Sequence, residues 1–470
     1  MAGTIVIGYN GTLPVSGTAD ISGTASVGLT YSKLQIAPSG FSYKTGDDLQ
    51  WTTFDLVSTT TDEVFRQEIW KLDYLRDKAL RWGSDASNSE PVNLFWTVDG
   101  ETVGRRSVVN DISYEVNSEE VLNANLGIDA AKVRLAVQHN PYWESTLLSS
   151  FAGTVSDLGG TIVIPLTDTN YPSRIKYLNL TGWAGDEFWT TRTKAWAGIR
   201  DYRNGVSGFI PVWEAEAGTN GTDTASTADA NARGGTVKIT SFATTTTMAK
   251  RFDVKWSQVA TANYDHLTGH YLVLGRMKLS AGTVECAAEL RHGWLGEAGL
   301  ESSLGVTYLS AVTNPELVNF NLVPLGIAEI PPTGDREAIA SGDGGASSPM
   351  KSYGLALYAE RLSGAGSMSF DCFVLIPADH LFIASQTAIH SSNGSSTRAY
   401  TGNDDINYAI KHTIANLYGN IEYSFENWNV PAGGGVMVLA AQSGTIHLLS
   451  GTITASGDYY KRFRSYRGTA

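Results

Sequence analysis

The sequence is poor in charge, in cysteine and in long apolar runs, and each shortage excludes a class of protein. Only 17% of its 470 residues are charged, against ~25% in typical soluble domains. No stretch approaches the ~20 uninterrupted apolar residues of a membrane helix, so an integral helical membrane protein is excluded. The two cysteines, Cys286 and Cys372, have no metal-ligand spacing, and we expect both to be reduced, buried thiols.

Basic residues are also in deficit. Lys and Arg number 34 against 47 Asp and Glu, which gives a net charge of −13. An acidic surface disfavours nucleic acid and anionic membranes, so we expect neither a specific nucleic-acid partner nor membrane insertion. Residues 1–4 show no basic stretch leading into an apolar run. We therefore expect synthesis in the cytoplasm without Sec export.

The sequence is instead rich in glycine, serine, threonine and aromatic residues, with 49 Gly, 12 Trp and 21 Tyr. This composition favours strands, turns and contact surfaces over helices. One long helix is predicted, over 62–82, because Thr60 and Glu63 have the spacing of a capping box. Apolar residues then recur at helical period, namely Phe65, Ile69, Leu72, Leu75, Ala79 and Trp82.

The rest of the chain reads as short strands between turn signals, so the predicted fold class is mainly β. Residues 1–157 combine a Gly-rich N-terminal arm with strands and the helix. Residues 158–378 are predicted to form a β-sandwich whose core is 208–377, because their strands have sandwich spacing. Residues 379–470 are expected to return to the first part. Residues 145–207 fit either the body or the sandwich.

No catalytic motif stands out. CxxC, HExxH, GxSxG and GxxxxGK[ST] are all absent. Ser348 and Lys351 match Ser-x-x-Lys, but they lie in a Gly/Ser loop without a second motif. His266 and His270 are four residues apart, but Gly269 between them indicates a turn. We therefore predict that the chain is not an enzyme.

One acidic pattern does indicate a site. In a predicted strand at 209–216, Glu214 and Glu216 lie on the same face, because alternate residues of a strand share a face. Neighbouring carboxylates repel one another unless they are paired or bind a cation, and hard oxygen ligands suit calcium. The alternative is an exposed acidic edge.

The same segment resembles a known module. A Glu-Ala-Glu strand, a Gly/Asp-rich loop, the run GHYLVL at 269–274 and an apolar closing strand with Asp371 resemble the jelly-roll carbohydrate-binding modules of the galactose-binding type. The resemblance implies a jelly roll, a structural calcium held by Glu214, Glu216 and Asp371, and a host surface glycan as ligand. The candidate sugar-binding aromatics are Trp256, Tyr264 and Trp294.

The flanks resemble siphophage and prophage distal-tail or minor tail proteins. The long helix is followed by EPVNLFW at 90–96 and RLAVQHNPYWE at 134–144, and the aromatic and basic run DYYKRFRSY at 458–466 resembles the last strand of that class. There the body is a tail-tube-type β fold, and a jelly-roll domain is inserted on the outside. The Gly-rich arm at 1–40 departs from this pattern.

This resemblance implies a structural virion protein of a phage tail, a distal-tail-like ring component that links the tail tube to the tail tip. Residues 1–157 and 379–470 would form the ring body. The implied partners are further copies of the chain, in a hexameric ring, and the tube, tape-measure and hub proteins. Two other functions fit the same residues: a tail tube protein with a decorating domain, and a glycan-binding adhesin based on 208–377. A glycan-degrading enzyme would rest only on the resemblance to a jelly roll and on scattered carboxylates.

Overall fold

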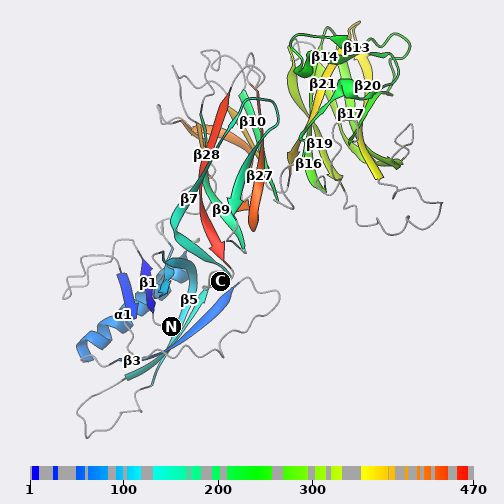
Figure 1. Cartoon of the computed structure of the whole chain (residues 1–470). Coiled ribbons are helices and arrows are strands. Elements are labelled where there is room, and N and C mark those ends of the chain that lie inside the picture. The colour runs from blue at the N-terminus through cyan, green and yellow to red at the C-terminus, as the bar shows by residue number, and fades with distance from the viewer. Residues whose placement is uncertain are drawn as a thin grey trace, which may run out of the picture.

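The computed structural model of the chain contains three bodies that follow one another in space (Figure 1). We call them the N-terminal body, the middle sandwich and the outer sandwich, and the first two together the platform. The structure describes residues 3–9, 25–29, 49–58, 62–82, 91–98, 103–117, 131–166, 169, 171–181, 193–201, 209–256, 268–294, 302–313, 319–330, 351–378, 381–386, 397–400, 410–412, 418–424, 429–442 and 452–463. Antiparallel sheets dominate these residues, which confirms the mainly β fold class.

The N-terminal body packs one helix on antiparallel sheet. The predicted helix 62–82 is confirmed as α1, which buries Leu72, Leu75 and Ala79 in one core with residues of β3, β5 and β6 such as Phe54 and Leu135. The amphipathic period therefore marked the buried face correctly. The elements of this body are β1 (Gly3–Tyr9), β2 (Ala25–Leu29), β3 (Gln50–Ser58), α1 (Asp62–Arg81), β4 (Asn93–Val98), β5 (Arg105–Asn117) and β6 (Ala131–His139).

The middle sandwich combines strands from the two halves of the chain. In one sheet β27 pairs with β8 and β10, and in the other β28 pairs with β7 and β9. Apolar residues from both sheets fill the space between them. The elements are β7 (Trp143–Val155), β8 (Gly160–Leu166), β9 (Tyr171–Thr181), β10 (Thr193–Asp201), β22 (Leu381–Gln386), β23 (Thr397–Tyr400), β24 (Ile410–His412), β25 (Tyr418–Ser424), β26 (Asn429–Val430), β27 (Gly433–Gln442) and β28 (Ile453–Phe463).

The last strand, β28, also takes part in the ion pairs and ring contacts between the middle sandwich and the N-terminal body. Arg462 of β28 donates from Nε to Glu144 Oε1 of β7 at 2.8 Å, and both side chains are buried. Arg106 of β5 lies 3.6 Å from the other oxygen of Glu144. Arginine side chains also stack on aromatic rings here. The pairs are Arg105–Phe463, Arg106–Tyr460 and Arg462–Tyr142.

The outer sandwich is made of two facing sheets, and all their strands lie between 212 and 377. One sheet has the order β13-β14-β21-β16-β19 with β11 beside β21, and the other has the order β12-β15-β20-β17-β18. The strands are β11 (Val212–Glu214), β12 (Thr219–Asn220), β13 (Thr224–Ala228), β14 (Thr236–Thr240), β15 (Ala249–Lys255), β16 (Gly269–Leu279), β17 (Thr283–Trp294), β18 (Ser302–Thr313), β19 (Asn321–Ile330), β20 (Lys351–Ser363) and β21 (Met368–Pro377).

The outer sandwich enters and leaves the platform through two paired strands. β10 precedes it and β22 follows it, and these strands pair from Thr193↔Gln386 to Gly198↔Leu381. Strands β8, β9 and β10, which lie within the predicted domain 158–378, thus pair with C-terminal strands instead of with strands of the outer sandwich. The first strand of the outer sandwich is β11, which begins at Val212, after the end of β10 at Asp201.

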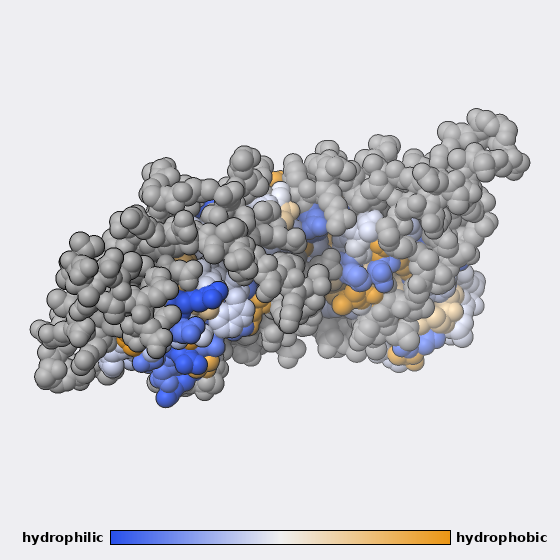
Figure 2. All heavy atoms as spheres, turned by 90° about the horizontal axis from the view of Figure 1, so that it is seen from below, coloured by the Kyte–Doolittle hydropathy of each residue, from blue (hydrophilic) through white to orange (hydrophobic). Residues whose placement is uncertain are grey.

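Polar and apolar residues are interspersed on the face of the molecule seen from below (Figure 2). Hydrophilic residues gather over the N-terminal body, and the coloured residues of this face form no broad apolar area. No helix in the described ranges is long and apolar enough to cross a membrane.

A buried histidine lies in the core of the N-terminal body. The His139 ring is 1% exposed. With its proton on Nδ1, the ring donates to the carbonyl oxygen of Asn140 at 2.8 Å and accepts from the Thr52 hydroxyl at 2.8 Å. Burial lowers the pKa of His139 from 6.5 to about 4, against the raising effect of the Asn140 hydrogen bond. The imidazole is therefore neutral in the fold at pH 7.

Acidification is expected to destabilise the N-terminal body through His139. Because the pKa is about 4 in the fold and 6.5 in the unfolded chain, the unfolded chain takes up the proton first as the pH falls. The stabilisation is complete above pH 6.5 and decreases by about 3 kcal/mol as the pH falls to 4. Denaturant unfolding of wild type and of His139→Gln across this range should show this loss in wild type alone. The same pH dependence in both proteins would contradict the assignment.

Candidate functional site

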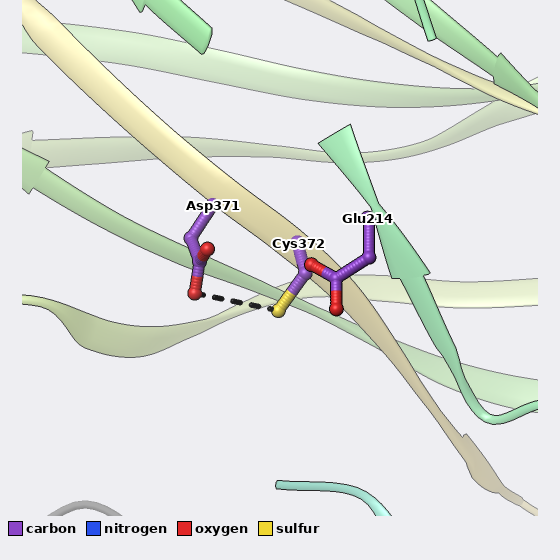
Figure 3. Close-up of side chains that lie close together, drawn as sticks. All are labelled: Glu214, Asp371 and Cys372. Atoms are coloured by element: carbon purple, nitrogen blue, oxygen red, sulfur yellow. Dashed lines mark hydrogen bonds between the residues drawn. The ribbon is translucent and has the colours of Figure 1, made fainter. Parts of the chain in front are cut away.

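The candidate site lies where the first strand of the outer sandwich meets its last. Glu214 of β11 is directly opposite Cys372 of β21 in the antiparallel register. A β-bulge falls in β21, because Arg276 faces Cys372 while the next residue of β16 faces Phe370. Asp371 is the extra residue, and a bulge redirects a side chain. Glu214, Asp371 and Cys372 consequently lie together, with ligand atoms within 4.8 Å of one another (Figure 3).

Glu216 lies near these residues too, but it belongs to a turn and not to the strand on which it was predicted. The strand predicted at 209–216 ends at Glu214, and a 3-10 turn, Ala215–Ala217, follows it. The alternation argument for Glu214 and Glu216 is therefore wrong, although their carboxylates do influence one another. The Glu216 carboxylate lies against Gly234, where a Cβ atom would come within 2.6 Å of its Oε1. Gly234 has a φ of +74°, which glycine adopts without strain.

Two arginines, which the sequence analysis did not identify, pair with these carboxylates. Arg276 of β16 donates from Nη1 to Asp371, and both side chains are almost completely buried, at 1% and 0% exposure. Arg233 donates from Nη1 to Glu214 and from its backbone N–H to Asp371 Oδ2 at 3.3 Å. Its remaining N–H groups reach Asp157 of the β7–β8 turn, with Nη2 at 2.6 Å from Oδ2.

The two arginines do not fully offset three carboxylates. The pKa of Glu214 is raised to about 7, because burial and the carboxylates of Glu216 and Asp371 together outweigh the lowering effect of Arg233. Burial also raises the pKa of Glu216, and it raises that of Asp371 against the lowering effect of Arg276. The raised pKa values mean that this poorly solvated place disfavours negative charge on the carboxylates, although Lys238 also acts on Glu216.

One oxygen of each carboxylate has no hydrogen-bond partner among the described residues: Oε2 of Glu214, Oε2 of Glu216 and Oδ1 of Asp371. A buried anionic oxygen without a partner is costly. A hard divalent cation between Glu214 and Asp371, whose ligand atoms lie within 4.8 Å of each other, would offset this cost, and Ca²⁺ takes about six to eight such oxygens. The donor set and its charge therefore fit the calcium that the resemblance implies.

The thiol of Cys372 does not belong to this donor set. Burial raises its pKa well above the ordinary value, and the nearby carboxylates of Asp371 and Glu214 raise it further. The Sγ–H group donates weakly to Asp371 Oδ2 at 3.8 Å. Metals bind the thiolate form of cysteine, so we assign the three carboxylates alone as ligands.

The predicted sugar-binding aromatics need correction. Trp256 is fully buried and lies 5.7 Å from the ring of Trp213, so it presents no face to a sugar. Tyr264 lies outside the described residues. Trp294 is the last residue of β17, and its side chain lies outside the described part. Both remain predictions.

Comparisons with known proteins add little. No family model matches the chain, and no curated protein matches it. One solved structure, titled "Structure of infectious bursal disease virus Gx strain", is 10% identical over 77% of this chain and 81% of that chain, with a TM-score of 0.16. At that TM-score, the likeness supports no conclusion about fold or function.

Proposed function

We propose that the chain is a structural subunit of a virion, a distal-tail-like protein of a long-tailed bacteriophage that closes into a ring. The platform would form the ring and contact the tube, tape-measure and hub proteins. The outer sandwich would face outward and contact host glycans. No catalytic role is part of this proposal.

The observation that carries the proposal is the way the chain builds its platform. Both ends of the chain contribute strands to it, and the outer sandwich is inserted between the paired strands β10 and β22. This is the arrangement expected for a ring body with an inserted jelly roll. An inserted domain can change its ligand without disturbing the body, which suits a subunit that combines assembly with recognition.

The proposed surface for self-association is strand β8 of the middle sandwich. Among the described residues, β8 pairs along one edge, with β27, and no strand is paired with its other edge. The strand reads GTIVIPL, without a charged residue, and Val163 is 42% exposed. Monomeric proteins protect such edges with charges or covering loops. A second copy of the chain would cover the β8 edge in a ring.

The assembly can be tested by mass. The purified full chain is expected to form a closed particle of about six times the 50.4 kDa of one copy. Val163→Lys places a charge on the open strand, so it should raise the protein concentration needed for assembly about tenfold. Size-exclusion chromatography with light scattering measures both.

Ile327→Lys is the matched control, because Ile327 is 56% exposed on the outer sandwich and should not affect assembly. Open-ended tubes instead of closed particles would favour the tail tube alternative. A monomer at every concentration, with glycan binding, would contradict the ring and favour the adhesin.

We also propose that Glu214, Glu216 and Asp371 hold a structural Ca²⁺. The bound ion would link β11, the turn after it and β21 through charge. Arg233 pairs with Glu214 and Arg276 pairs with Asp371, and these contacts hold the two carboxylates in place. Their unpartnered oxygens support the proposal.

Calcium should stabilise the outer sandwich of the full chain. An ion that binds only the native state at 100 times its Kd adds about 2.7 kcal/mol, so CaCl₂ should raise the melting temperature by several degrees over EDTA. Asp371→Asn should abolish this difference. Glu329→Gln, which changes a carboxylate that is 69% exposed in the same sandwich, should preserve it. Equal melting temperatures of wild type in CaCl₂ and EDTA would exclude the site.

A further inference from the structure

The joint between the two sandwiches is closely packed. Leu158 and Trp196 of the middle sandwich share one buried core with Val212 and Trp213 of the outer one. Gly159 is pressed against that strand, since a Cβ atom there would lie 2.5 Å from Cγ2 of Val212. The contact is therefore specific, and small displacements of the outer sandwich would open it.

Polar contacts between described residues cross this joint, and two of them are made by arginines. Arg233 of the outer sandwich donates to both carboxylate oxygens of Asp157 in the middle one, with distances of 2.6 to 3.1 Å. Arg200 of β10 donates from Nη1 to the hydroxyl of Tyr271 at 2.8 Å. Of the two, Arg233 alone also contacts the carboxylate cluster.

The three carboxylates surround the short turn that carries Arg233. Glu214 accepts from its side chain, Asp371 accepts from its backbone N–H, and Glu216 lies against the next residue, Gly234. Asp371 is fully buried and has one oxygen without a partner. An ion held by these three groups would therefore fix the turn from which Arg233 reaches Asp157.

We propose that a divalent cation at Glu214, Glu216 and Asp371 tightens the joint between the outer sandwich and the platform, with Arg233 as the positioning residue. The inference rests on the calcium site proposed above. Coupling between two sites is reciprocal, so the Arg233–Asp157 contact must in turn strengthen cation binding. The orientation of the outer sandwich on a virion would then depend on the calcium concentration outside the cell.

The test measures calcium binding and the joint separately in the full chain. Isothermal titration with CaCl₂ gives the affinity, and hydrogen exchange of residues 157–160 and 209–213 reports on the joint. In wild type, CaCl₂ should slow exchange in both segments. Asp157→Asn keeps the carbonyl oxygen that bonds to the Leu158 N–H but weakens the bidentate pair. It should bind Ca²⁺ at least about fivefold more weakly and lose the calcium-dependent protection.

Tyr271→Phe is the matched control. It removes the second polar contact across the joint without touching a carboxylate, so exchange should rise while its response to CaCl₂ is kept. If wild type binds Ca²⁺ but exchange at the joint does not respond, or if Asp157→Asn binds Ca²⁺ with unchanged affinity, the joint proposal is wrong and the calcium site stands. If wild type binds no Ca²⁺, the joint proposal and the calcium site are both wrong, while the ring proposal is unaffected.

Discussion

The structure depends on the last strand of the chain. β28 lies between β7 and β9, so that both of its edges are hydrogen-bonded to strands almost three hundred residues earlier in the sequence. Its Arg462 places a charge beside Glu144 where water does not reach. Removing one member of such a buried pair costs about 3–5 kcal/mol. The two ends of the chain therefore form one platform, and everything between β10 and β22 is an insertion.

The insertion is held by more than its two connecting strands. Apolar residues of both sandwiches form one continuous core, and Arg233 links the carboxylate cluster to Asp157 of the platform. The cluster that would hold calcium therefore lies beside the joint and not at the far end of the outer sandwich. In the proposed function, assembly and recognition belong to two bodies that are in direct contact.

Local patterns in the sequence predicted local structure well. The capping box and the apolar period located α1 within one residue at its end, and the turn-rich composition indicated the mainly β class. Pairing between distant segments leaves no such trace. Strands β8, β9 and β10 pair with C-terminal strands, which periodicity does not reveal. Asp371 depends on a bulge, and Arg233 and Arg276 reach their partners only through the fold. The sequence pattern also did not show that Trp256 is buried.

The most direct test of this account is to remove residues 452–470, which include β28, and to map the folded parts by limited proteolysis and hydrogen exchange. If the last strand closes the platform, strands β7 and β9 should lose protection while the outer sandwich from 209 to 378 stays protected. A platform that remains protected without residues 452–470 would contradict the claim that both ends of the chain are needed to build it.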